Sequence, residues 1–164
     1  MKPKRVAFLG LCVTLSMVLS YFESLVPPLT SVPGIKIGFA NLVTVFMLYR
    51  FGAKETVAVS IIRVVLVNML FGTTMTLIFS LAGSICSLVS MILLKKNGKF
   101  SLLTVSVVGG VLHNVGQIIT AVFIMETSQI IFYLPILLIS GTVAGVIIGL
   151  LAALIVKRME RVKL

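Results

Sequence analysis

The chain has 164 residues, of which 59% are hydrophobic and only 11% are charged, and its mean hydropathy is +1.23. Roughly a quarter of the residues in an average soluble domain are charged, so this composition excludes a soluble fold, which could not cover its surface with so few polar groups. The formal net charge of +10 comes from basic residues that stand between long apolar runs, as in the cytoplasmic loops of membrane proteins, and this spacing argues against a nucleic acid as partner.

Four basic clusters divide the chain into three apolar stretches. They lie at residues 2–5, 50–54, 95–99 and 157–163 and hold twelve of the 14 Lys and Arg residues. If all four clusters face the cytoplasm, each stretch crosses the bilayer an even number of times, and each has room for two crossings. The sequence therefore predicts an all-α integral membrane protein with a single transmembrane domain over 1–164, made of six transmembrane helices in three hairpins with both termini in the cytoplasm.

The first hairpin is predicted to have helices over 6–25 and 37–51. The loop between them is apolar and stiffened by prolines, so it is either a connector at the membrane interface or a lid over a binding site. In the second case Pro33, Gly34 and Lys36 would shape the entrance to that site.

Two of the predicted helices carry small residues on one face. On the first helix these are Ala7, Gly10 and Thr14, and on the last helix glycine recurs at Gly141, at Gly145 and once more four residues later. Such surfaces let helix backbones approach closely in lipid. They predict either packing inside the bundle or docking of another membrane subunit.

The second hairpin is predicted over 55–71 and 74–94, and its first helix carries Arg63 near the centre of the membrane. A charged side chain at that depth is costly and indicates a functional site by default. The chain has no Asp, and no Glu lies in the middle of a predicted helix, so Arg63 has no obvious carboxylate partner at its own depth. Its guanidinium is either bonded to protein groups and water or binds an anionic ligand.

The third hairpin is predicted over 101–125 and 129–156. Its first helix carries His113, Asn114 and Gln117 close together, and His113 and Gln117 share a face because they are four residues apart. These polar side chains form either a site lined by ligand or water or a knot of hydrogen bonds between helices, each worth about 1 kcal/mol.

Further polar residues follow a pattern of depth. Glu23, Asn41 and Asn68 lie toward the outer ends of their predicted helices, whereas the cytoplasmic halves are almost wholly apolar apart from small hydroxyl side chains. At about 1.5 Å per residue, these groups and Gln117 extend from the midplane to the outer surface. The sequence thus predicts a cavity that is open to the outside and closed to the cytoplasm.

Several kinds of chemistry lack the residues they need. The sequence contains no phosphate-binding loop of the GxxxxGK[ST] type and no Asp to hold Mg²⁺ on a diphosphate. One His and two Cys provide no zinc or haem site. We therefore expect neither an enzyme nor a resident metal or cofactor.

Six segments carry a combined motif pattern. They are SYFESL at 20–25, PGIKIGFAN at 33–41, Arg63 with NMLFG at 68–72, SLAG at 80–83, HNVGQ at 113–117 and YLP at 133–135. In that order they resemble the bacterial Gx transporter family, whose members also carry the name heptaprenyl diphosphate synthase component I. The resemblance covers about residues 5–155.

This resemblance implies a six-helix fold like that of the substrate-binding S components of energy-coupling factor transporters, in the cytoplasmic (inner) membrane of a bacterium. In such systems a separate transmembrane subunit and two ATPases supply the energy. S components usually dock through small residues on the first helix. The matching surface here would be Ala7, Gly10 and Thr14, which departs from a clean Ala-x3-Ala pattern.

Three functions are compatible with these features. The first is a solute-binding subunit of an importer, which captures a small anionic or amphipathic molecule. The residues expected to contact that solute are Glu23, Asn41, Arg63, Asn68, His113, Asn114 and Gln117. The second is a non-catalytic membrane subunit that anchors or regulates an enzyme of isoprenoid or quinone synthesis. The third is a carrier coupled to protons or ions, against which the absence of carboxylates in mid-membrane argues.

Overall fold

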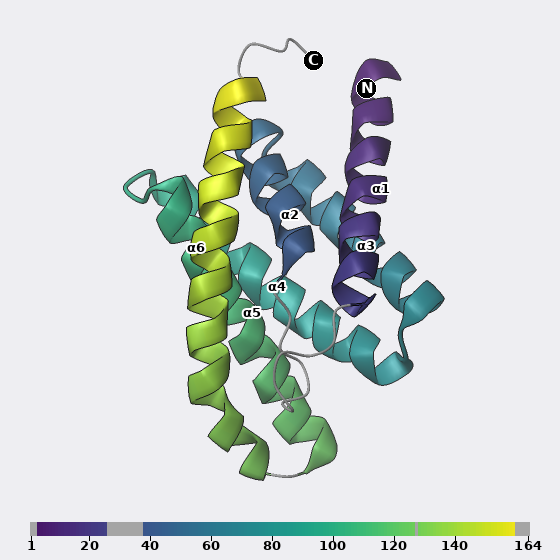
Figure 1. Ribbon diagram of the computed structural model, residues 1–164, viewed down its shortest axis with the longest axis vertical. Helices are drawn as coiled ribbons and strands as arrows, with labels where there is room; N and C mark the ends of the chain where they lie inside the picture. Colours follow the sequence, from purple (N-terminus) through teal and green to yellow (C-terminus); the bar gives the residue numbers. More distant parts are fainter. Residues whose placement is uncertain (1–2, 26–37, 127, 160–164) are drawn as a thin grey trace.

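The computed structural model describes residues 3–25, 38–126 and 128–159 of the chain. These residues form six α-helices and one short 3₁₀ helix (Figure 1). In chain order they are α1 (Pro3–Leu25), α2 (Phe39–Arg50), α3 (Ala53–Phe71), α4 (Thr74–Asn97), α5 (Leu102–Met125), η1 (Ser128–Tyr133) and α6 (Leu134–Met159). The fold is all-helical in the part of the chain that is described.

Four stretches of helix are long and apolar enough to cross a membrane, namely those at Pro3–Glu23, Thr74–Asn97, Leu102–Met125 and Gln129–Met159. Their outward side chains are apolar and exposed, such as Phe123 at 79%. A soluble monomer rarely exposes so much contiguous apolar surface. These features are those of a membrane protein.

The two remaining helices differ in length and charge. α2 has only 12 residues, about 18 Å of helix, but most of its side chains are buried among the other helices. α3 has 19 residues and carries Lys54, Glu55 and Arg63. Four of the six helices therefore meet the criteria for a membrane span, and the six spans predicted from the sequence stay a prediction.

The helix ends follow local chemistry. α4 begins with a capping box, in which the side chains of Thr73 and Thr76 each accept from the other's backbone N–H. α2 begins at Phe39 rather than at residue 37, because Gly38 has a left-handed backbone with φ of 80°. The single helix predicted over 129–156 is wrong at its start, which is a 3₁₀ helix. Pro135 explains the break, since proline fits only the first turn of an α-helix.

Glycines bring α4, α5 and α6 into close contact. A Cβ at Gly145 of α6 would lie 2.6 Å from the Cα of Val107 in α5. On the opposite side of α5, a Cβ at Gly116 would lie 2.9 Å from Sγ of Cys86 in α4. The glycine face of α6, which begins at Gly141, therefore packs inside the bundle, and this settles the choice between the two interpretations of that pattern.

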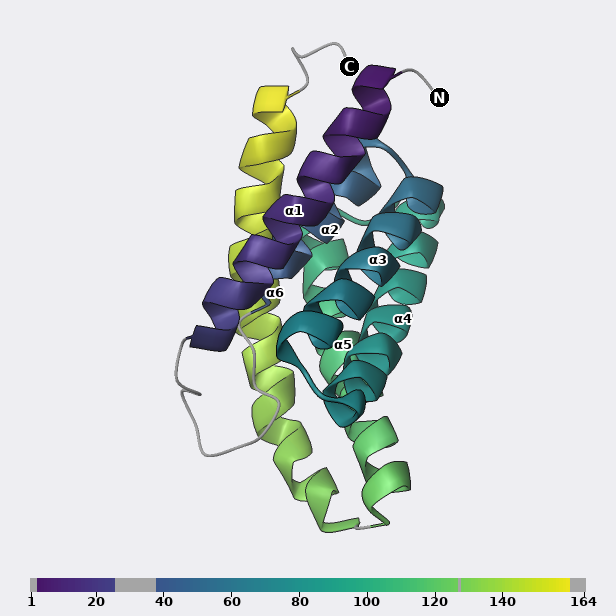
Figure 2. The same cartoon turned by 90° about the vertical axis from the view of Figure 1, so that its right-hand side faces the viewer.

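The first turn of α1 and the last turn of α6 lie at the same end of the bundle, as Figures 1 and 2 show. At this end Arg5 of α1 forms an ion pair with Glu55 of α3. Lys95 near the end of α4 donates a hydrogen bond to the backbone carbonyl of Leu48 in α2. These two contacts join helix ends that carry separate basic clusters. We call this end of the bundle, where the first turn of α1 and the last turn of α6 lie, the terminal end.

Candidate functional site

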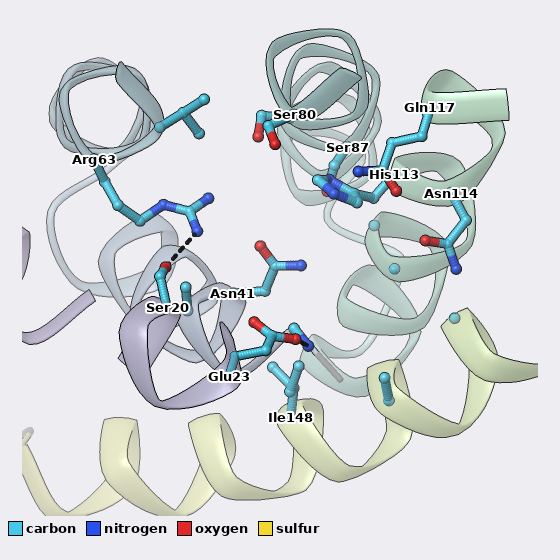
Figure 3. A pocket seen from close by; sticks show the side chains of 18 of the residues that line it. Ser20, Glu23, Asn41, Arg63, Ser80, Ser87, His113, Asn114, Gln117 and Ile148 are labelled. Carbon is cyan, nitrogen blue, oxygen red and sulfur yellow. Dashed lines mark hydrogen bonds between the residues drawn. The ribbon is translucent and has the colours of Figure 1, made fainter. Parts of the chain in front are cut away.

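A cavity of about 160 Å³ lies between the helices, and all six of them contribute to its wall (Figure 3). It brings together every residue that the sequence singled out for contact with a solute. These are Glu23, Asn41, Arg63, Asn68, His113, Asn114 and Gln117. The structure therefore places these seven residues around one space, and their binding of a solute stays a prediction.

Arg63 extends from α3 toward the C-terminal half of α1 (Figure 3). Its Nη1 donates a long hydrogen bond of 3.4 Å to Oγ of Ser20. Its Nε is buried and has no hydrogen-bond partner. A guanidinium offers five N–H donors, so Arg63 keeps donor capacity beside the cavity.

Glu23 is the negatively charged side chain among the described residues that line the cavity. Its carboxylate accepts a hydrogen bond from the backbone N–H of Gly38, directly before α2. A carboxylate is favoured there because the N-terminus of a helix carries a partial positive charge. Glu23 and Arg63 both line the cavity, and the prediction that Arg63 has no carboxylate partner at its own depth stays a prediction. The C-terminal half of α1 meets α3 through the hydrogen bond from Arg63 to Ser20, and α1 is inclined in the bundle (Figure 2).

His113 and Gln117 lie one turn apart on α5 and face α4 (Figure 3). Gly83 of α4 makes room for both. A Cβ at Gly83 would lie 2.8 Å from Cγ of Gln117 and 3.0 Å from Cε1 of His113. The two side chains thus fill the place that a larger residue on α4 would occupy.

Asn114 is buried and makes a structural contact. Its Nδ2 donates a 2.7 Å hydrogen bond to the backbone carbonyl of Leu137 in α6. The sequence left two roles open for Asn114, binding of a ligand and a hydrogen bond between helices, and this bond is of the second kind. Asn68 uses its Nδ2 in a similar way, donating to the carbonyl of Val64 within α3 at 2.8 Å. Both amides reach the cavity with one donor group already engaged.

The cavity wall also contains a row of hydroxyl groups that our sequence analysis missed. Thr76, Ser80, Ser84 and Ser87 of α4 all line it. Their spacing of four, four and three residues places them on one face of a helix, and this spacing is the signal that could have revealed them. Ser84 is buried, and its Oγ has no hydrogen-bond partner.

The two ends of the cavity differ in burial. Near the α3–α4 turn its wall includes Gly72 and Thr76, which are exposed. Toward the terminal end it includes Met91 and Ser106, which are 2% and 3% exposed. Met91 belongs to an apolar core on this side of the cavity, formed by Val45, Leu48, Leu88, Met91, Val105, Ile148 and Ala152. The cavity is thus closed by packed side chains toward the terminal end.

Two other groups of predicted residues can be placed only in part. Pro33, Gly34 and Lys36, predicted to form an entrance or lid, lie outside the described residues. Ala7, Gly10 and Thr14 are exposed on the outer face of α1, and a Cβ at Gly10 would meet nothing within 4 Å. That this face docks another subunit stays a prediction. Within the described ranges, no group of three His, Cys, Asp or Glu residues could hold a metal ion.

One family of known proteins matches this chain. The family model described as heptaprenyl diphosphate synthase component I matches residues 12–155, a range that includes all the residues lining the cavity. No curated protein and no solved structure matches the chain significantly.

Proposed function

The chain belongs to the heptaprenyl diphosphate synthase component I family, and from that premise and the polar cavity we propose that it is the membrane-embedded solute-binding subunit of an importer. It captures a small anionic or amphipathic solute and resembles an S component of an energy-coupling factor transporter. The observation that carries the proposal is Arg63, whose Nε is buried without a partner beside the cavity.

The membrane arrangement that we propose has all six helices within the bilayer and the terminal end in the cytoplasm. The contacts between Arg5 and Glu55 and between Lys95 and Leu48 support this arrangement, because they gather basic helix ends on one side. Basic residues concentrate on the cytoplasmic side of bacterial membrane proteins. In this orientation the packed core closes the cavity toward the cytoplasm, and the solute enters from outside.

Energy for import must come from another protein in this proposal, since the sequence has no phosphate-binding loop. We propose a transmembrane coupling subunit and two ATPases as partners. The exposed face of α1 with Ala7, Gly10 and Thr14 would receive the coupling subunit, because small residues let two helix backbones approach closely.

Metabolites that co-purify with the protein test the solute-binding proposal. Wild type, Arg63→Ala and His113→Ala would be purified in the same detergent, and the bound small molecules would be identified by mass spectrometry. Thr142→Ala is the matched control, because Thr142 is exposed on α6 and its hydroxyl donates only to the carbonyl of Leu138. We expect a ligand that is present in wild type and the control and absent from both cavity variants. Identical profiles in four folded proteins would refute solute capture.

A second function is favoured by the family name, in which a component I implies a partner subunit. In this alternative the chain is a non-catalytic membrane subunit of isoprenoid or quinone synthesis. A heptaprenyl chain has about 35 carbons, roughly six times as many as benzene, which fills a cavity of about 150 Å³, so the enclosed space of about 160 Å³ does not contain the whole chain. Co-purification of a soluble prenyl transferase, with no bound solute, would support this alternative.

A further inference from the structure

The cavity contains one positively and one negatively charged side chain among the described residues that line it, Arg63 and Glu23. Figure 3 shows both side chains directed toward the same space, with Asn41 between them and the His113 side of the wall. Among the described residues of the wall, the two charges therefore balance before any solute enters.

Glu23 is held in place by the backbone. Its carboxylate accepts from the N–H of Gly38, and Gly38 in turn has a left-handed conformation that sets the start of α2. A carboxylate fixed at a helix N-terminus is a stable part of the site, because the helix dipole favours its negative charge. A solute that enters the cavity thus meets the charge of Glu23 as well as the free donors of Arg63.

We infer that the cavity selects a compact solute without net charge, whose hydrogen-bond acceptor meets the guanidinium of Arg63. The inference rests on the proposed function and decides between its anionic and amphipathic solutes. An anion would leave the site with an uncompensated negative charge in an environment of low dielectric constant, which is costly. A neutral or zwitterionic solute uses the same donors and keeps the balance.

The size of the cavity narrows the class further. A protein cavity of about 150 Å³ accommodates one benzene molecule, and this cavity has about 160 Å³. The enclosed part of the cavity therefore matches a group about the size of benzene, and a slightly larger solute can extend toward the exposed end lined by Gly72 and Thr76. Hydroxyl groups on α4 and the side chains of His113 and Gln117 offer it further hydrogen bonds.

Three probes of equal size test the inference. Benzoate, benzamide and benzamidinium share one shape and carry negative, zero and positive charge. Their dissociation constants would be measured by concentration-dependent thermal stabilisation of the purified full chain in detergent at pH 8. In wild type we expect benzamide to bind about tenfold or more tightly than either charged probe. A charged probe would add an unbalanced charge within a few ångströms of Arg63 and Glu23, and the resulting loss of binding free energy corresponds to at least a tenfold weaker dissociation constant.

The variant Glu23→Gln makes the prediction specific. The amide oxygen still accepts from the N–H of Gly38, while the negative charge is removed, so the site becomes net positive. We expect benzoate to become the tightest probe in this variant. In Arg63→Gln, where only Glu23 is charged, we expect benzamidinium to become the tightest.

Several results would overturn the inference. Benzoate binding wild type as tightly as benzamide would do so, as would an unchanged order of probes in Glu23→Gln or no binding of any probe to wild type. These outcomes are distinguishable from failure of the proposed function. If a metabolite co-purifies with wild type and is lost in Arg63→Ala, solute capture stands even where the order of the probes is wrong.

Discussion

Two buried serines in the cavity wall should respond to the same substitution in opposite ways. Ser84 of α4 is 6% exposed, and its Oγ has no hydrogen-bond partner. Ser106 of α5 is 3% exposed, and its Oγ donates a 2.8 Å hydrogen bond to the backbone carbonyl of Gly145. Replacement by alanine removes one hydroxyl from each place while the volume lost is the same. The hydrogen bonding of each hydroxyl therefore sets the sign of the change in stability.

The magnitudes follow from the two environments. A hydrogen bond between membrane helices is worth about 0.6 kcal/mol on average, so Ser106→Ala should lower the free energy of unfolding by about that much or slightly more. A buried hydroxyl without a partner costs about 1–3 kcal/mol, so Ser84→Ala should raise the free energy of unfolding by about 1 kcal/mol. The two variants should thus differ by roughly 1.5 kcal/mol, the sum of these effects.

Denaturant unfolding of the two variants and wild type in one detergent measures this difference. The reasoning is refuted if Ser84→Ala is destabilised as much as Ser106→Ala, because its hydroxyl would then have a favourable partner. Binding of the co-purified solute provides the second measurement. A Ser84→Ala protein that is more stable but binds the solute more weakly would show that this hydroxyl is reserved for a ligand.

Three further predictions concern packing, the buried amide and topology. Gly145→Ala should destabilise the bundle by about 1–3 kcal/mol, because its Cβ would lie 2.6 Å from the Cα of Val107. Gly10→Ala should leave stability unchanged or raise it slightly. Equal thermal stability of the two variants would contradict the close packing of α5 and α6. Asn114→Leu should lower the free energy of unfolding by about 1 kcal/mol or less, because the hydrogen bond to Leu137 is lost. A decrease of more than about 3 kcal/mol would show that Asn114 stabilises the fold through further contacts. The topology is tested with single cysteines in a chain without native cysteines. Lys96→Cys should react with a membrane-impermeant maleimide only after the cells are opened, whereas Glu126→Cys should react in intact cells. The reverse pattern would show that the proposed topology is inverted.

The sequence predicted the helical class and the residues of the cavity well because membrane helices carry strong local signals. A long apolar run predicts a helix, and a polar residue within such a run is rare enough to be noticed. Arg63, His113 and Gln117 were found in this way. The row of serines on α4 was missed because a single small hydroxyl is common in apolar helices, and only its spacing distinguishes it.

Other features depend on how the helices cross, and no local pattern records that. The placement of Glu23 of α1 and Arg63 of α3 around one cavity depends on how these helices cross. The 3₁₀ helix before α6 had a local signal in Pro135. The sequence analysis did not use this signal, and the apolar run continues on both sides of that proline.

The glycine contacts divide the bundle into a tightly packed wall and a looser one. α4, α5 and α6 approach one another so closely that single methyl groups on Gly83, Gly116 or Gly145 would clash. On the other side of the cavity, Gly10 of α1 has open space around it, and α1 packs on α2 and α3 through an apolar cluster that includes Cys12, Phe46 and Val59 and through the ion pair of Arg5 with Glu55. The two side chains of this ion pair are 42% and 23% exposed, and ion pairs open to water contribute only about 0–1 kcal/mol.

Local stability should follow this division, because segments with fewer packed contacts open at a lower free energy. Hydrogen exchange of the full chain in detergent should show backbone amides around Gly116 in α5 exchanging more slowly than those around Gly10 in α1. Addition of the solute should slow exchange most in the segments of α1 and α3 around Ser20 and Arg63, because the solute joins the looser wall to the rigid one. Uniform exchange rates in all six helices, unchanged by the solute, would refute this assignment.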